Sequence, residues 1–159
     1  MDLPRARLVG EAVVLPDEQA MSYMLSSDFD PARQVVLSDP PPIDLPGGEV
    51  VGSVEWVERN NNDMTLRVST DGPALLVVAD NWFPAWRARI GDEEVPVLRA
   101  NHSVRAVPLT AGEHTVELYY ASDQLTWSFR LTLISLAIVG GLIAMDWMRA
   151  RRSPELRAG

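Results

Sequence analysis

A stretch of fifteen uncharged residues near the C-terminus, LTLISLAIVGGLIAM, constrains this chain more than any other feature. As a helix, this stretch, Leu131–Met145, would be about 22 Å long, which is shorter than the ~30 Å hydrocarbon core of a bilayer. Extension to residues 125–148 gives a full span. The stretch therefore predicts a transmembrane helix over 125–148, and the alternative that it leaves open is a helix buried in a protein core.

The residues around this predicted helix fit the two boundaries of a membrane. Tryptophan is enriched at membrane–water interfaces, and a long arginine side chain near a helix end can extend toward the headgroups. Ala137 with Gly141, and Gly140 with Ala144, form small-xxx-small pairs that allow close packing against another helix. The flanking residues expected to anchor the helix are Trp127, Arg130, Trp147, Arg149, Arg151 and Arg152.

The charge of the chain divides at this helix, although the 159 residues together have a formal net charge of only −8. Residues 1–126 hold 20 acidic residues and 9 arginines, a net charge of −11, whereas residues 127–159 hold 2 acidic residues and 5 arginines, a net charge of +3. Because cytoplasmic flanks of membrane helices carry excess positive charge, we expect a cytoplasmic tail over 149–159 and an extracytoplasmic segment over 1–126. A tail-anchored protein with a cytoplasmic domain is the competing arrangement.

Other features of the sequence bear on the partners of the chain. The segment Met1–Arg5 does not open the apolar run that a signal peptide needs. We therefore expect the chain to be the end of a longer polytopic protein, whose upstream transmembrane helices and the lipid bilayer would be its partners. The acidic balance argues against a nucleic-acid binder, which needs a basic surface. The absence of Cys excludes disulfides, thiolate metal ligands and a Cys nucleophile.

The segment before the helix has the pattern of a β-rich domain. Asn62–Asp71 and Glu113–Ala121 alternate apolar and polar residues, as half-buried strands do. Ala74–Ala79 is a continuous apolar run, which is typical of a strand buried on both faces. Further strands are predicted at Arg7–Val14, Gln34–Leu37, Val50–Val57, Trp86–Ile90, Val95–Arg99 and Ser103–Val107.

A short helix is predicted at Asp17–Leu25, with Ala20, Met24 and Leu25 facing inward, and the proline-rich Asp39–Gly48 is predicted to be an extended linker. The fold class that follows is mainly β: a two-sheet antiparallel β-sandwich of jelly-roll-like form with one short helix, followed by a single C-terminal transmembrane helix. The expected domains are an N-terminal segment of strands, helix and linker over 1–48, a sandwich core over 49–123, the membrane helix over 125–148 and the basic tail over 149–159.

The sequence contains none of the common catalytic motifs: G-x-S-x-G, a P-loop, G-x-G-x-x-G and H-E-x-x-H are all absent. His102 and His114 lie in or beside predicted turns, where solvated histidines are common. Asp28 and Asp30 lack the spacing of calcium ligands. We therefore expect no metal, no cofactor and no catalytic residue in this chain.

A dense aromatic cluster, DNWFPAW, follows the predicted buried strand. Aromatic faces stack on sugar rings, and neighbouring amide and carboxylate groups can bond hydroxyls. The residues predicted to contact a glycan are Asn81, Trp82, Phe83 and Trp86. The alternative is structural, with the three aromatic side chains closing one end of the sandwich.

Several motifs follow one another between Ala74 and Tyr120. They are Phe83-Pro84-Ala85-Trp86, Leu98-Arg99-Ala100-Asn101, Arg105-Ala106-Val107-Pro108-Leu109 and Ala111-Gly112-Glu113-His114. In this order they resemble the C-terminal extracytoplasmic domain of the bacterial YfhO-like membrane proteins, in which one last membrane helix follows. Arg5–Val14 and Asp28–Leu37 resemble the linker of that family, so the resemblance covers nearly the whole chain. Two departures are Ala85, where Gly is usual, and Gly91-Asp92, which replaces a usual Asp-Gly turn.

The resemblance implies a polytopic membrane protein related to multi-spanning glycosyltransferases that use lipid-linked sugars. In such enzymes an acidic residue of an early external loop is catalytic, and that loop is outside this chain. The resemblance therefore implies a non-catalytic accessory domain that supports sugar transfer to cell-envelope polymers, with a cell-envelope glycan as a partner. The alternative is a stand-alone, single-pass β-sandwich that serves in binding or assembly.

Overall fold

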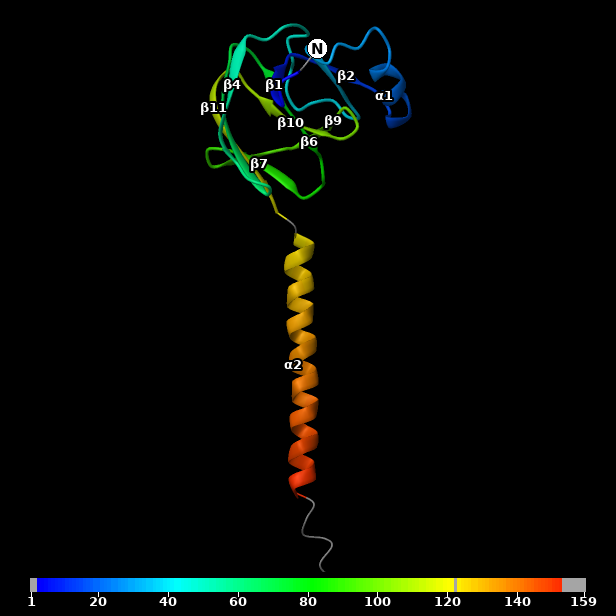
Figure 1. Cartoon of the computed structure of the whole chain (residues 1–159), viewed down its shortest axis with the longest axis vertical. Coiled ribbons are helices and arrows are strands. Elements are labelled where there is room, and N and C mark those ends of the chain that lie inside the picture. Colours follow the sequence, from blue (N-terminus) through cyan, green and yellow to red (C-terminus); the bar gives the residue numbers. More distant parts are fainter. Residues whose placement is uncertain (1–2, 122, 153–159) are drawn as a thin grey trace, which may run out of the picture. The chain divides into compact units, whose positions relative to one another are not determined.

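The computed structural model describes residues 3–121 and 123–152. Within helix α2 (Asp123–Arg152) it describes the side chains of residues 131–145, 147 and 148. The chain divides into two compact units, Met1–Ala121 and Ser122–Gly159 (Figure 1). The first unit is mainly β with one short helix, α1 (Asp17–Met24), and the second contains α2.

Two sheets make up the described part of the first unit. The first sheet has the strand order β1-β6-β10-β9-β3-β2, with β1 (Ala6–Val9), β6 (Ala74–Asn81), β10 (Val104–Leu109), β9 (Leu98–Ala100), β3 (Gln34–Leu37) and β2 (Glu11–Val14). The second has the order β4-β5-β11-β7-β8, with β4 (Gly52–Arg59), β5 (Asp63–Thr70), β11 (Gly112–Tyr120), β7 (Trp86–Ile90) and β8 (Glu93–Val95). The prediction of a mainly β fold with two sheets is confirmed.

One pair of strands departs from the antiparallel prediction. All neighbouring strands are antiparallel except β2 and β3, which run parallel with Glu11 opposite Gln34. Parallel neighbours need a crossover connection, and α1 lies in the segment that joins these two strands.

Gly10 breaks the strand predicted over Arg7–Val14 into β1 and β2. Only this residue separates the two strands, yet they lie at opposite edges of the first sheet, so the sheet curls until its edges meet there. Gly10 pairs with Gly48, and a Cβ at Gly10 would lie 2.3 Å from the Gly48 carbonyl oxygen. The single-strand prediction was therefore wrong, because the close approach of a distant segment is not visible in the local pattern.

Residues on the two faces of the first sheet form separate clusters. Leu76 and Val78 of β6 pack into the core between the two sheets, whereas Leu75 and Val77 pack into a second cluster on the other face. All four side chains are fully buried, which confirms the strand predicted to be covered on both faces. The core between the sheets contains Ala6, Met64, Leu66, Val68, Leu76, Val78, Trp86, Ala88, Val107, Leu109, Val116 and Leu118.

The second cluster lies on the concave face of the curled sheet, because it joins Val9 of β1 to Val35 of β3 near the opposite edge. The segment Asp39–Gly48 contains no helix, as predicted, and its Ile43 and Leu45 pack against this cluster. The extended segment thus covers part of the core as well as connecting β3 to the second sheet.

Two further local predictions were wrong. The strand predicted over Val95–Arg99 is divided, because β8 ends at Val95 in the second sheet and β9 begins at Leu98 in the first. Pro96 lies between them, has no N–H group for a sheet, and marks the point where the chain changes sheets. In α1, Ala20 is buried as predicted, but Leu25 lies past the end of the helix and is 81% exposed.

Helix α2 is apolar along the middle of its length. The large hydrophobic side chains of the uncharged stretch Leu131–Met145 are all exposed in this unit. Among the residues that the structure describes, no helix is both long enough and apolar enough to cross a membrane. The membrane span predicted over 125–148 therefore stays a prediction.

Candidate functional site

A pocket lies at one end of the sandwich, where several strands begin or end. We call it the end pocket, and its volume is about 320 Å³. The residues that line it come from the turn before β5, the end of β6, the turn after β6, and the adjoining ends of β7, β10 and β11. They are Asn61, Asn62, Asn81, Phe83, Trp86, Arg105 and Tyr120.

Backbone pairing brings these residues together. Tyr120, the last residue of β11, lies opposite Trp86, the first residue of β7. The Tyr120 backbone N–H donates to the Asn62 carbonyl oxygen at 2.8 Å, which places the turn before β5 beside them. The pocket is thus fixed by sheet register and not by one flexible loop.

The aromatic rings of the pocket differ in burial. Trp86 is 5% exposed and belongs to the core between the sheets. Its ring meets that of Tyr120 edge to face, with 5.6 Å between centroids and 75° between planes. Phe83 is 53% exposed and Tyr120 is 41% exposed. Trp86 therefore forms the apolar base of the pocket, whereas Phe83 and Tyr120 are available to a ligand.

Arg105 lies beside Trp86, and a β-bulge contributes to its position. The register between β10 and β6 shifts between Val104 and Arg105, so that Val104 lies opposite Asn81 but Arg105 lies opposite Val78. Arg105 is 5% exposed, and its Cζ lies 3.5 Å from the centroid of the Trp86 ring. Its Nε donates to the Asn81 carbonyl oxygen at 3.0 Å. Bulges commonly redirect a side chain in this way.

The guanidinium of Arg105 carries a charge that the described residues do not pair. Burial lowers the pKa of this guanidinium and the nearby Asp80 carboxylate raises it, but arginine stays protonated at neutral pH. Asp80 itself accepts a hydrogen bond from Nε of Arg5 at 2.9 Å. Within the described part of the chain, Arg105 forms no ion pair.

The structure brings together three of the four residues predicted to contact a glycan. Asn81, Phe83 and Trp86 line the end pocket, whereas Trp82 lies beside a different pocket with Val97 and Leu98. Trp82 Nε1 donates to the Val97 carbonyl oxygen at 3.0 Å, which ties the turn after β6 to the segment before β9. Trp82 is thus held by the fold away from the other three.

Sequence reasoning missed the other residues of the pocket. Val107 and Leu109 set the inner face of β10, and a period of two places Arg105 on that same face. A charged residue at an inward position was therefore a readable signal. Tyr120 continues the inner face of Val116 and Leu118 in the same manner, whereas Asn61 and Asn62 carried only a turn signal.

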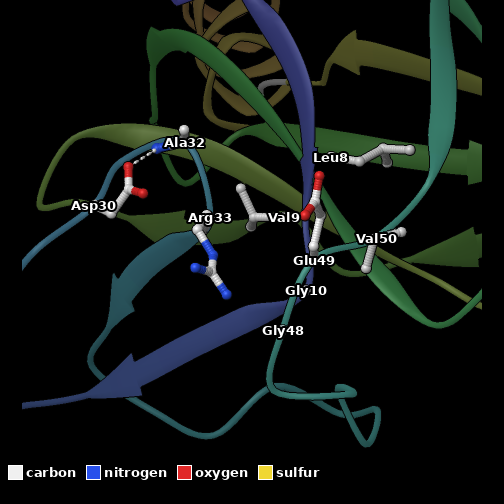
Figure 2. A pocket seen from close by; sticks show the side chains of 9 residues that line it. All are labelled: Leu8, Val9, Gly10, Asp30, Ala32, Arg33, Gly48, Glu49 and Val50. Atoms are coloured by element: carbon white, nitrogen blue, oxygen red, sulfur yellow. Dashed lines mark hydrogen bonds between the residues drawn. The ribbon is translucent and has the colours of Figure 1, made fainter.

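A second pocket, of about 280 Å³, lies where Gly10 meets Gly48 (Figure 2). It is lined by Leu8, Val9, Gly10, Asp30, Ala32, Arg33, Gly48, Glu49 and Val50. One carboxylate oxygen of Asp30 accepts from the Ala32 N–H at 3.0 Å, as is common in turns. Asp30, Arg33 and Glu49 are all exposed. The residues that line this pocket include no aromatic side chain.

The two histidines of the sequence lie in different elements of the fold. His114 belongs to β11, and its Nε2 lies 2.8 Å from the Thr110 carbonyl oxygen. His102 lies in the turn before β10 and has a positive φ of 67°. Within residues 3–121 and the described part of α2, no group of three or more His, Cys, Asp or Glu side chains is placed to hold a metal ion.

Most of the predicted membrane-flanking side chains cannot be placed. The side chains of Trp127, Arg130, Arg149, Arg151 and Arg152 lie outside the described residues. Trp147 is described and is exposed on α2.

Comparison with known proteins gave no relative: no family model, no curated protein and no solved structure matches the chain. The resemblance to the YfhO-like proteins therefore depends on the motifs of the sequence alone.

Proposed function

We propose that this chain is a membrane-anchored, non-catalytic accessory module whose β-sandwich contacts saccharide at the end pocket. The observation that carries the proposal is the meeting of Phe83, Trp86 and Tyr120 with Asn61, Asn62 and Asn81 around one cavity.

The chemistry of the pocket suits a sugar ring. Pyranose rings present apolar C–H faces that pack on aromatic side chains, and their hydroxyls need partners that both donate and accept hydrogen bonds. The amide of an asparagine supplies both functions. Phe83 and Tyr120 supply exposed aromatic surface beside three such amides.

Helix α2 supports the anchoring part of the proposal. A helix that is apolar on all sides is buried in a protein core or in a membrane. The exposed hydrophobic residues of α2 include the consecutive pairs Leu133–Ile134, Ile138–Val139 and Leu142–Ile143, and consecutive residues point about 100° apart around a helix. We propose a bilayer as the surrounding medium, with the residues on both sides of 131–145 extending the span to 125–148.

The resemblance to YfhO-like proteins adds a biological setting to the proposal. In that setting residues 1–126 are extracytoplasmic, the tail over 149–159 is cytoplasmic, and the sandwich assists sugar transfer to a cell-envelope polymer carried out by upstream parts of the parent protein. No residue of this chain is given a catalytic role.

A saccharide titration tests the proposal. We would add methyl glucoside and methyl glucuronide separately to the full chain in detergent micelles and follow aromatic and amide NMR signals. We expect at least one sugar to shift the signals of Phe83 and Tyr120. Phe83→Ala should weaken that binding about fivefold or more, given the ~1 kcal/mol typical of one aromatic contact.

Leu25→Ala is the matched control, since it also removes an exposed hydrophobic side chain and lies at α1, away from the residues that line the end pocket. If neither sugar shifts any signal of the end pocket, or if both variants weaken binding equally, the proposal is wrong.

A further inference from the structure

We propose that Arg105 makes the end pocket selective for acidic saccharides, which carry a carboxylate or a phosphate group. The inference rests on the proposed function, in which this pocket contacts saccharide, and it names the chemical class of the ligand.

The lining of the pocket contains a positive charge and no negative charge. Of its seven lining residues, all of them described, Arg105 alone carries a charge, and the others are amides or aromatic side chains. This is unexpected in a chain whose residues 1–126 have a net charge of −11. An acidic ligand in the pocket would therefore meet a cation and no lining carboxylate.

The guanidinium retains donor capacity toward the pocket. Its Nε donates to the Asn81 carbonyl oxygen, and Nη1 has only a long contact of 3.8 Å with the sulfur of Met64. Nη2 donates to none of the described residues. Every buried side-chain nitrogen or oxygen among those residues has a hydrogen-bond partner, so Nη2, which has none, is not buried. It can therefore donate to a group that enters the pocket, which Arg105 lines.

The setting of Arg105 also favours a strong interaction with an anion. Contact with the Trp86 ring, 3.5 Å from Cζ to the centroid, restrains the guanidinium, and hydrogen bonds between a charged donor and a charged acceptor are about twice as strong as neutral ones. Because Arg105 is 5% exposed, solvent screens its charge less than it screens arginines on the outer faces of the sheets. The fold thus prepares a cation before the ligand binds.

A purely structural role is the alternative. In that role Arg105 only fills the end of the core, satisfies the Asn81 carbonyl group and stacks on Trp86. A structural role predicts no preference between an acidic sugar and a neutral sugar of the same shape.

The test compares matched sugars on the full chain in detergent micelles. The probes are methyl glucoside, methyl glucuronide and glucose 6-phosphate. We expect the acidic probes to bind about tenfold tighter than the glucoside, as a charge-assisted hydrogen bond implies. The glucuronide and phosphate arms show which anion the pocket prefers. The side-chain ¹⁵N signals of Arg105 should shift with the acidic probes more than with the glucoside.

Two arginine variants test whether Arg105 causes the preference for acidic sugars. Arg105→Gln should remove the preference while the glucoside still binds, and Arg67→Gln, an exposed arginine paired with Glu55 on the second sheet, should retain it. Thermal unfolding shows whether Arg105→Gln is folded. If it is not, the wild-type preference and the ¹⁵N shifts decide the question.

The outcomes separate the two proposals. Equal binding of acidic and neutral probes by the wild type, or an acidic preference that leaves the Arg105 signals unmoved, overturns the selectivity while the saccharide site stands. Loss of the preference in the Arg67 variant also overturns it. If no probe binds, the proposed function fails first and the selectivity fails with it.

Discussion

Arg105 occupies a position that the rest of β10 gives to aliphatic side chains. Val107 and Leu109 lie on the same inner face and are fully buried or nearly so. A charged side chain at such a position needs partners, because moving a charge out of water is unfavourable. Asn81, Trp86 and the open pocket provide them, so this residue links the end of the core to the candidate site.

Trp86 and Phe83 should separate the structural and the binding roles of the aromatic cluster. Trp86 belongs to the core, so Trp86→Ala should lower the free energy of unfolding by about 3–5 kcal/mol. Phe83 is largely exposed, so Phe83→Ala should change it by about 0.5 kcal/mol or less while weakening saccharide binding. Urea denaturation of both variants measures the difference. A large loss of stability in the Phe83 variant would show that its ring is structural.

Asp17 should make the stability of the first unit depend on pH. Hydrogen bonds from Arg99 and from Ser38 lower the pKa of the Asp17 carboxyl group, with Arg99 Nη2 2.6 Å from Oδ2. A lowered folded-state pKa stabilises the fold above the ordinary aspartate pKa, and the effect is lost as pH falls through the folded value. Asp17→Asn should therefore lower the unfolding midpoint at pH 7.

The difference between wild type and Asp17→Asn should shrink steadily as the pH is lowered from 5 toward 2. Glu18→Gln is the matched control, because it removes a neighbouring carboxylate from the same first turn of α1. A difference that stays constant over this range, or that grows at low pH, would contradict the role given to the Arg99 contact.

At the scale of the elements, Gly10 decides how the first sheet closes. Replacement by Ala would place a Cβ 2.3 Å from the Gly48 oxygen, so β1, β2 or the segment around Gly48 would have to move. We expect Gly10→Ala to lower the free energy of unfolding by about 1–3 kcal/mol, as overpacking typically does. Denaturation with urea provides the measurement.

Gly48→Ala is the control for that change. A Cβ at Gly48 would have no neighbour within 4 Å among the described residues, and Gly48 is not one of the positive-φ positions. It should therefore have little effect on stability. Since Gly→Ala also lowers the entropy of the unfolded chain, which by itself stabilises a fold, equal losses in the two variants would contradict the role given to the close approach at Gly10.

The sequence pattern predicted the bounds of an element well where neighbouring residues define them. The strands at Gln34–Leu37 and Trp86–Ile90 have the predicted bounds, because turn residues and apolar runs define them. It missed the break at Gly10 and the change of sheet at Pro96, since both depend on segments that are distant in sequence. The jelly-roll-like form of the sandwich stays a prediction.

The candidate site shows the same division. The aromatic cluster could be found from the sequence, but the direction of each ring could not. Trp82 and Trp86 are close in sequence, and only the pairing of β7 with β11 places Trp86 beside Tyr120. The inward position of Arg105 was readable from the period of β10. The contributions of Asn61 and Asn62 required the hydrogen bond that joins β11 to their turn.

Over the whole molecule, an acidic β-rich segment is followed in the chain by an apolar helix and a basic tail. Residues 1–126 carry a net charge of −11 and residues 127–159 carry +3, with the fifteen uncharged residues of 131–145 in the second part. We propose that α2 lies in a bilayer and anchors the sandwich that carries the end pocket.

Single-cysteine labelling tests this membrane anchor, because the sequence contains no cysteine. We would reconstitute the full chain into liposomes as Leu136→Cys, in the middle of the uncharged stretch, or as Leu25→Cys, at the exposed end of α1, and add a water-soluble maleimide. Both sites should react rapidly after the sample is unfolded in detergent. In liposomes that are permeable to the reagent, the account predicts rapid labelling of Leu25→Cys and protection of Leu136→Cys. Equally rapid labelling of the two variants would contradict a membrane anchor.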